Sequence, residues 1–464
     1  MRNRFFYLSV ILILVLLGSL IVQVSMQNVK RIVKPYSEIP RGGDVAVIGG
    51  TTAALIAALV ASEHGAQVHL FPQGQELGGD AVYLINEGLA AWNTPSQKAW
   101  ENAQAIEENS EEETGEIKLT RESFHRMLLA RGEGMNDPHL LNAFIEKSPQ
   151  LHAWMHQLGI SFDVMPRPEY NPFWLQTSTP QAGLVFRNKL LEKLEQRSVF
   201  IQEETIQAIE VSEENRAVKA LTLRNEQSET SVFYVQAVVL ADGGYSSDLM
   251  SWYDYLPHHN IVNLRPGQTG RGIQKAAELF ADVVQSDFFN RRMVLSDSQS
   301  VQYQLLPRKP WENTFLVNKN GQSLDLNLAK PGEAFSFIVN APAEGVYIGV
   351  PEEKALPMLH FFTRFEHWDQ AVEAGWLDQA PSLQFAPPYY LSRVQAGVDF
   401  TLGGLSVTPK GEVRRRGRVI NGLFAAGEIA GGLHGEAMAE GMPLSETLFL
   451  GHSAGGAAAG YARR

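Results

Sequence analysis

The feature that most constrains this chain is a strand–turn–helix–strand pattern between residues 45 and 71. Residues 45–48 form a short apolar run that ends at Gly49-Gly50. Residues 51–64 are rich in Ala and Leu and predict a helix, and residues 67–71 form a second apolar run. Such a unit, completed within about 30 residues, is typical of the start of a parallel sheet that binds dinucleotides. The sequence therefore predicts a doubly wound α/β domain.

The turn at Gly49 matches the dinucleotide fingerprint G-x-G-x-x-G/A in part. Gly49 and Ala54 supply the tight first turn and the small third position. Thr51, after Gly50, stands where the second glycine belongs, and its hydroxyl could itself donate to a phosphate. No carboxylate follows the second strand to bind ribose hydroxyls, so Gln73 is the candidate for that contact. On its own, this motif leaves a Gly-rich turn in some other α/β protein as an alternative.

Three later segments extend the pattern. Gly78-Gly79-Asp80 follows the second strand, and residues 235–241 are a continuous apolar run that ends at Asp242-Gly243. A run of this kind fits a strand buried on both faces of a parallel sheet. Near the C-terminus, residues 421–435 read as a strand followed by a Gly-rich loop that contains Gly427-Glu428, and a helix rich in Ala and Gly comes next.

Taken in order, these segments resemble the fumarate reductase/succinate dehydrogenase flavoprotein family, in its single-chain, flavocytochrome-like form, over residues 43–464. The resemblance implies a Rossmann-like FAD-binding domain that is split in sequence. It also implies that Glu428 binds the cofactor, that His434 lies next to the flavin and that Leu444-Ser445 touches its ring. The flavin is expected to be non-covalent, because no histidine lies near Gly78-Gly79 to attach it. The expected cofactor-binding residues are Gly49, Gly50, Thr51, Ala54, Gln73, Gly78, Gly79, Asp80, Asp242, Gly243, Gly427, Glu428, His434, Leu444 and Ser445.

The side chains that bind a dicarboxylate in this family are missing here. Met438 replaces the family's arginine, and Asp399-Phe400 replaces a pair of histidines. Exchanging Arg for Met removes a charge and a bidentate partner for a carboxylate. Fumarate is therefore not an expected substrate, and the acidic and apolar replacements suit a neutral or cationic one better. Asp399 and Glu436 are the candidate catalytic residues, each as a general base.

Charge and composition exclude several classes of protein. The formal net charge is -12, whereas a nucleic-acid-binding protein needs a basic face, so no nucleic-acid partner is expected. The chain has no cysteine, which excludes disulfides, Cys-ligated zinc, iron–sulfur clusters and thiol catalysis.

Redox chemistry must then come from an organic cofactor or from a metal with N and O ligands, and we expect no metal site. Besides a small-molecule substrate, a separate electron donor or acceptor is needed, since no relay is encoded.

The N-terminus predicts an attachment to a membrane. Residues 5–24 are nearly all Leu, Ile, Val and Phe, and about 20 such residues span the hydrocarbon of a bilayer. We expect a single transmembrane anchor over residues 1–28 and a tether over residues 29–42. A cleaved signal peptide is the alternative, although the candidate cleavage sites are poor. The charges on either side specify the orientation weakly, and we favour a body outside the cytoplasm.

The remaining chain is expected to divide into an FAD-binding domain, residues 43–289 and 389–464, and an inserted α+β cap that carries the substrate, residues 290–388. The interpretation is an FAD-dependent oxidoreductase in which hydride passes to or from flavin N5. One alternative is a non-catalytic flavin-binding interaction module, favoured by Thr51 and by the lost substrate residues. A nicotinamide-dependent dehydrogenase without flavin is the other, and the C-terminal Gly427-Glu428 block counts against it.

Overall fold

The computed structural model describes most of the chain beyond the N-terminal segment. The predicted anchor and nearly all of the tether lie outside the described residues. Among the helices that are described, none combines the length and the apolar character needed to cross a bilayer. The described residues are 42–107, 119–165, 171–214, 216–248, 261–265, 267–268, 270–296, 303–306, 313–329, 332–341, 345–358, 360–383 and 385–464.

The chain forms two compact units that differ from the predicted domain ranges. The first unit comprises the chain up to Gly243 together with Arg271–Val284 and Gly404–Arg464, and the second comprises Gly244–Gly270 and Gln285–Gly403. Sequence analysis places residues 389–401 in the FAD-binding domain. In the structure these residues form strand β18 (Tyr389–Thr401), which pairs with strands of the second unit along most of its length and so belongs to that unit.

The first unit is built on a mostly parallel sheet, as the α/β prediction requires. Its strand order is β20-β21-β9-β1-β2-β6, with the β7–β8 hairpin added antiparallel to β9. The chain runs from β1 to β2 on one side, while β9 pairs with β1 on the other, so the strand order reverses beside β1. Ligands of doubly wound sheets bind at such a reversal. The strands are β1 (Gly42–Ile48), β2 (Val68–Phe71), β6 (Phe200–Ile201), β7 (Thr205–Val211), β8 (Val218–Arg224), β9 (Thr230–Leu240), β20 (Glu412–Arg415) and β21 (Arg418–Ala425).

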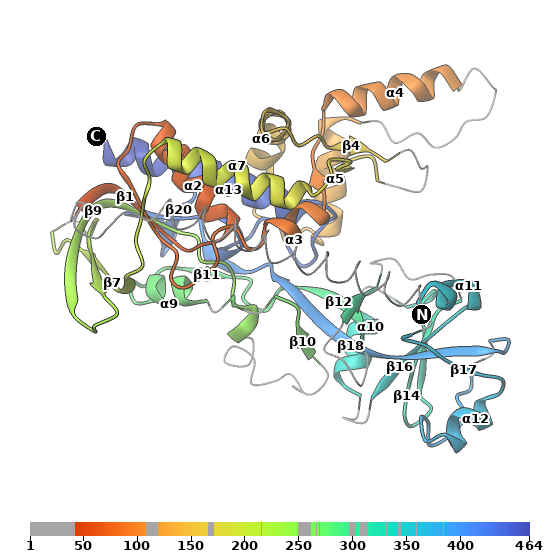
Figure 1. The fold of residues 1–464 in the computed structure, drawn as a ribbon. Helices are drawn as coiled ribbons and strands as arrows, with labels where there is room; N and C mark the ends of the chain where they lie inside the picture. The colour runs from red at the N-terminus through yellow and green to blue at the C-terminus, as the bar shows by residue number, and fades with distance from the viewer. Residues whose placement is uncertain are drawn as a thin grey trace, which may run out of the picture. The chain divides into compact units, whose positions relative to one another are not determined.

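Two buried helices pack together against this sheet, α2 (Thr52–Glu63) and α13 (Met442–Ala462), and α7 (Ala182–Gln196) lies beside α2 (Figure 1). Both are apolar around most of their circumference, which is typical of helices enclosed on all sides. Their close contact depends on small residues. A side chain at Gly451 would lie 2.9 Å from Ile56, and one at Gly455 would run into the carbonyl of Ala57.

Shorter elements complete the first unit. Strands β3, β4 and β5 form one small sheet, and β11, β19 and β22 form another. The remaining described elements are α3 (Ala81–Asn86), α4 (Pro95–Glu107), α5 (Arg121–Arg131), α6 (Pro138–Gln157), α9 (Arg271–Ala277), β3 (Leu89–Ala90), β4 (Asp163–Val164), β5 (Trp174–Gln176), β11 (Val283–Val284), β19 (Gly404–Ser406), the short η5 (Gly427–Ile429) and β22 (Ala430–Gly431).

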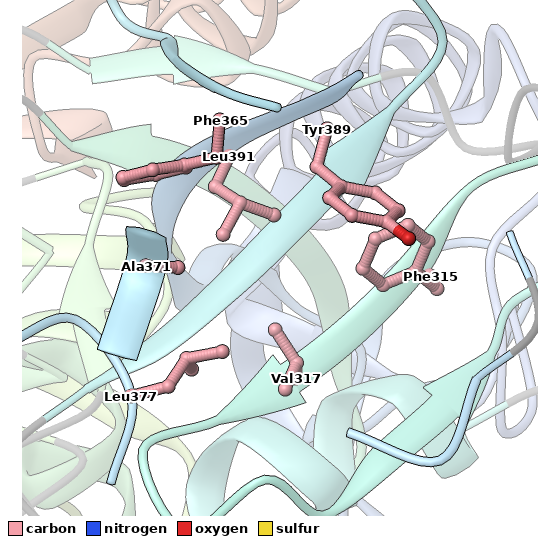
Figure 2. Packing of buried hydrophobic residues seen from close by; sticks show 7 residues of the cluster. All are labelled: Phe315, Val317, Phe365, Ala371, Leu377, Tyr389 and Leu391. Atoms are coloured by element: carbon pink, nitrogen blue, oxygen red, sulfur yellow. The ribbon is translucent and has the colours of Figure 1, made fainter. Parts of the chain in front are cut away.

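The second unit is a mixed sheet centred on β18, with short helices at its edges. Its strand order is β13-β12-β18-β16-β14-β15, and β10 and β17 also pair with β18. Phe315, Phe365 and Tyr389 contribute to a buried apolar cluster on this sheet (Figure 2), and Trp368 stacks on Tyr389 with ring centroids 3.8 Å apart. The elements are η2 (Ser246–Asp248), β10 (Ile261–Asn263), β12 (Phe289–Ser296), β13 (Tyr303–Leu305), β14 (Phe315–Asn318), β15 (Ser323–Asp325), α10 (Glu333–Val339), β16 (Val346–Val350), α11 (Glu352–Ala355), η4 (Leu356–Met358), β17 (Thr363–Phe365) and α12 (Trp368–Glu373).

Candidate functional site

The candidate site lies at the carboxyl edge of the parallel sheet, where the loops after β1, β9 and β21 meet. Strands β1, β9 and β21 run parallel, so these loops emerge on the same side. Gly49 (φ 126°) turns so tightly that a side chain there would run into the carbonyl of Ala241. At Gly427 (φ 75°) a Cβ atom would lie 2.6 Å from the Cβ of Ala53. Only glycine meets both demands, a left-handed backbone and no room for a side chain.

Thr51 joins two of these loops. Its hydroxyl donates to the carbonyl of Ala241, after β9, at 2.6 Å. The same oxygen caps α2 by accepting from the backbone N–H of Ala54 at 3.3 Å. A hydroxyl has one proton, and in this arrangement Ala241 accepts it. The threonine in place of the second glycine therefore ties the start of α2 to the end of β9. Donation to a phosphate stays a prediction, and it requires the bond to Ala241 to open.

Two side chains bind the backbone donors of this turn. The amide of Gln75 accepts from the N–H of Gly50 at 2.8 Å and donates to the carbonyl of Asp242 at 2.7 Å. The carboxylate of Asp80 accepts from the N–H of Thr52 at 2.8 Å and from its hydroxyl at 2.6 Å. N–H groups at the start of a helix are the usual partners of a pyrophosphate. Gln75 and Asp80 therefore occupy donors that a bound dinucleotide would use.

Gln73, the predicted ribose ligand, is bonded to another strand. Its amide donates to the carbonyl of Glu204 at 3.0 Å and accepts from the N–H of Ile206 at 2.9 Å. Both contacts hold the start of β7 beside the loop after β2. Ribose binding by Gln73 stays a prediction, and it requires one of these bonds to open.

The Gly78-Gly79 segment is held against the turn by α7. The N–H of Gly78 donates to the carbonyl of Gly50 at 2.6 Å, and that of Gly79 donates to the carbonyl of Glu76 at 3.1 Å. Arg187, buried on α7, donates from Nε to the carbonyl of Leu77 at 2.7 Å. Its guanidinium also pairs with the exposed carboxylate of Glu76 at 2.7 Å. A charged donor thus positions the segment that carries Asp80.

Asp242 carries one of the buried carboxyl groups of the site. Its Oδ2 accepts from the N–H of Gly272 at 2.8 Å, while Oδ1 has no hydrogen-bond partner within the described part of the chain. Burial raises the pKa of Asp242 to about 6, although the Gly272 N–H and the charge of Arg271 oppose the shift. Gly243, which follows, has a φ of 90° and is the last residue of this part of the first unit.

The C-terminal loop brings a histidine and a glutamate together in a buried pair. His434 Nε2 lies 3.1 Å from Glu446 Oε2, and both side chains are almost fully buried. Asn136 fixes the loop by donating to the carbonyl of Leu433 at 2.8 Å. Glu428, after β21, is also buried. His434 and Glu428 were predicted from the sequence. Glu446 was not, because its position on α13, one residue after Ser445, carries no local signal.

Leu444 and Ser445 are buried at the start of α13. The Ser445 hydroxyl lies 2.9 Å from the carbonyls of Ala90 and Gly441 and accepts from the N–H of Ala90 at 2.9 Å. These contacts attach α13 to β3. The predicted contact of Leu444-Ser445 with the flavin ring is not tested by them and stays a prediction.

The two candidate catalytic residues belong to different units. Asp399, on β18 of the second unit, is 1% exposed and accepts from Asn290 Nδ2 at 2.6 Å. Its other oxygen lies 3.8 Å from a guanidinium nitrogen of Arg292. Glu436, in the first unit, is half-buried, and its backbone N–H donates to the carbonyl of Gly132 at 3.2 Å. The structure thus gives Asp399 a fixed set of partners, and a role as general base stays a prediction for both.

Comparison with known proteins identifies the family. Residues 44–444 match the model of the FAD binding domain family. The NADH:fumarate oxidoreductase of Klebsiella pneumoniae (strain 342) is 24% identical over 473 residues, which cover 91% of this chain. The NADH:acrylate oxidoreductase of Vibrio harveyi is 22% identical over 504 residues, covering 89% of this chain. The chain spans 48% and 50% of the lengths of these two relatives.

The fold is also similar to a solved structure, the open conformation of a flavocytochrome c3 fumarate reductase. The TM-score is 0.71 at 20% sequence identity, covering 92% of this chain and 80% of the other. This chain therefore belongs to the FAD binding domain family, and the resemblance to the fumarate reductase flavoproteins is confirmed. Its cofactor is FAD.

The glycines and small residues at the sheet edge are those that an FAD-binding turn needs, but two of its backbone N–H groups are already bonded to side chains. Gly49, Ala54 and Gly427 provide the tight turn and the small residues with which a dinucleotide-binding fingerprint packs its helix closely on the strand. Gln75 and Asp80 must release Gly50 and Thr52 if a pyrophosphate is to use those N–H groups. The described residues contain no cluster of His, Asp or Glu that could hold a metal ion.

Proposed function

We propose that this chain is an FAD-dependent oxidoreductase that reduces a carbon–carbon double bond in a neutral or cationic small molecule. One observation carries the substrate class. Met438 and Phe400, which replace an arginine and a histidine of the dicarboxylate site, are each 1% exposed and apolar. Asp399 adds a negative charge whose partners come from the protein itself. A dianion would therefore lose the bidentate cationic partner that an arginine supplies at position 438 and the histidine donors at positions 399 and 400.

The reaction class follows from chemistry that the relatives share. Fumarate and acrylate, named for two relatives, both contain a double bond conjugated to a carbonyl carbon. Bound FAD supplies the hydride for such a reduction. The chain's own residues hold the cofactor: we propose the turn at Gly49, the loop at Asp242, and Glu428 and His434 near the C-terminus. Asp399 and Glu436 stay the two candidates to move the accompanying proton.

The test is anaerobic reoxidation of the reduced protein, followed at the flavin absorbance near 450 nm. The panel contains vinyl phenols and unsaturated ketones as neutral compounds, unsaturated amines as cationic ones, and acrylate as a monoanion. We expect at least one neutral or cationic compound to reoxidise the flavin in a saturable way, and the E436Q variant to do so more slowly. An exposed replacement, E226Q, serves as the matched control. A panel in which only anions react would contradict the proposed substrate class.

We also propose that residues 1–28 anchor the protein in a membrane, with its body outside the cytoplasm. The support is the apolar run at residues 5–24. For the electron partner, a quinone, a soluble carrier, O₂ and a separate protein are all candidates. Fractionation with an alkaline carbonate wash tests the anchor: the full chain should stay with the membranes and a chain without residues 1–30 should not. Release of the full chain into the wash would refute it.

A second candidate function is a non-catalytic flavin-binding module. It is favoured by Gln75 and Asp80, which bind the N–H groups of Gly50 and Thr52. A module of this kind would bind FAD without responding to substrates. In the reoxidation assay, an oxidoreductase reacts with a member of the panel, whereas the module shows only the background rate with every compound.

A further inference from the structure

A second pocket lies in the first unit, at the far end of α2 from the Gly49 turn. Thr51 caps one end of α2 and His64 the other, and a helix of 12 residues is about 18 Å long. The pocket has a volume of about 600 Å³ and is lined by α2, α6, α13 and the segment before β20. Its polar lining includes His64, Lys147, Lys410 and His452. It is therefore a different place from the cofactor site.

Lys147 is the central cation of this pocket. It projects from α6, and its ammonium group donates to the hydroxyl of Ser453 on α13 at 3.1 Å. Burial lowers the pKa of Lys147 below its usual value. Within the described part of the chain, no carboxylate lies within 4.0 Å of this ammonium group. A partly desolvated cation without a counter-charge is costly, and an anion beside it would offset that cost.

His452 precedes Ser453 on α13 and adds a second polar group to the pocket. Its Nε2 is buried and has no hydrogen-bond partner within the described residues. The ring stands edge-on to Trp154, with centroids 4.5 Å apart, which fixes its orientation. Burial lowers the pKa of His452 to about 4, and the charges of Lys147 and His64 act in the same direction. At neutral pH the imidazole is uncharged and can offer one N–H to a ligand.

Two carboxylates, those of Glu146 and Glu412, also line the pocket. Glu146 is directed to Arg121, with 3.6 Å between nitrogen and oxygen. Glu412 accepts from the hydroxyl of Thr408 at 2.8 Å. Lys410 and Arg464 add two further cations to the lining. The lining therefore carries three cations, Lys147, Lys410 and Arg464, against two carboxylates, of which Glu146 is paired with Arg121.

We propose that this pocket binds a small oxyanion, a phosphate or carboxylate group, against Lys147, Ser453 and His452. Lys147 supplies the charge-assisted hydrogen bond, and the hydroxyl and the imidazole supply neutral donors from one turn of α13. The pocket is wide enough for the rest of a small metabolite as well as the anionic group. The proposal does not depend on the reaction at the flavin.

Isothermal titration of the full-length, FAD-loaded protein tests the proposal, with inorganic phosphate in one arm and acetate in the other, both at constant chloride. We expect one saturable site. K147Q should weaken binding about tenfold, K147R should largely restore it, and H452Q should weaken it less. K189Q, which changes an exposed lysine on α7, is the matched control and should bind as the unaltered protein does.

The two arms distinguish the source of the anion. If only phosphate binds in a saturable way, the site is assigned to a phosphate group. If only acetate does, the site is assigned to a carboxylate. Saturable binding of neither anion overturns the proposal, and so does binding that K147Q leaves unchanged. Circular dichroism of each variant shows whether it is folded. K147R keeps the positive charge, so binding by K147R but not by K147Q attributes the loss to the charge.

Discussion

Replacing Asp242 by asparagine should stabilise the protein in a pH-dependent way. Burial raises the pKa of this carboxyl from 3.8 to about 6. Below the lower value, folded and unfolded chains are both protonated, and the group costs nothing. Between the two values only the folded chain holds the proton, so stability falls as pH rises, and above pH 6 the penalty is complete. A shift of roughly 2 pKa units corresponds to about 3 kcal/mol.

Denaturant unfolding of the FAD-free chain at two pH values measures this penalty. About 2 kcal/mol of this penalty develops between roughly pH 4.5 and 7.5. The free energy of unfolding of D242N, relative to that of the original protein, should therefore rise by about 2 kcal/mol between these two pH values. Any fixed cost of the asparagine, such as an imperfect bond to Gly272, cancels in the comparison of the two pH values. E226Q, at an exposed carboxylate, should show no such change. The reasoning is refuted if D242N and the original protein keep the same difference at both pH values.

Three further outcomes are expected. D80N should tighten FAD binding about threefold in a flavin-fluorescence titration, because it removes a negative charge from the start of α2; equal or weaker binding would speak against competition by that carboxylate. R187M should cost about 2 kcal/mol in denaturant unfolding, since the carbonyl of Leu77 loses a charged donor; a change within about 0.5 kcal/mol would show the contact to be unimportant. D399L should cost about 3–5 kcal/mol and D399N less, because leucine leaves the buried Arg292 without its carboxylate; a stable D399L by thermal unfolding would contradict this.

The start of the fold could be predicted from the sequence because its signals are local. The apolar run of β1, the glycine turn and the Ala-rich α2 follow one another directly and lie as predicted. The assignment of β18 could not be predicted, because its partners β12 and β16 lie far away in sequence. An alternating or apolar run shows that a strand exists but does not show which sheet it joins.

In the candidate site, too, residues with a local sequence signal could be predicted and residues that depend on distant partners could not. Gly49, Gly427 and Asp242 could be placed at the edge of the parallel sheet from the sequence, because each follows a buried apolar run. Their contact with the cofactor stays a prediction. Gln75 gave no signal, since its bonds run to Gly50 and Asp242, 25 and 167 residues away. Glu446 was missed for a similar reason, because its pairing with a histidine 12 residues earlier depends on how the intervening loop folds.

The most direct test of the central claim is the rate at which fumarate reoxidises the dithionite-reduced, FAD-loaded protein, followed near 450 nm under anaerobic conditions. Because Met438 and Phe400 are apolar and buried at the positions of the family's dicarboxylate ligands, and Asp399 is bonded to Asn290, we expect no rate above the buffer background. Saturable reoxidation by fumarate at an ordinary enzymatic turnover, on the order of 1 s⁻¹ or faster, would contradict it.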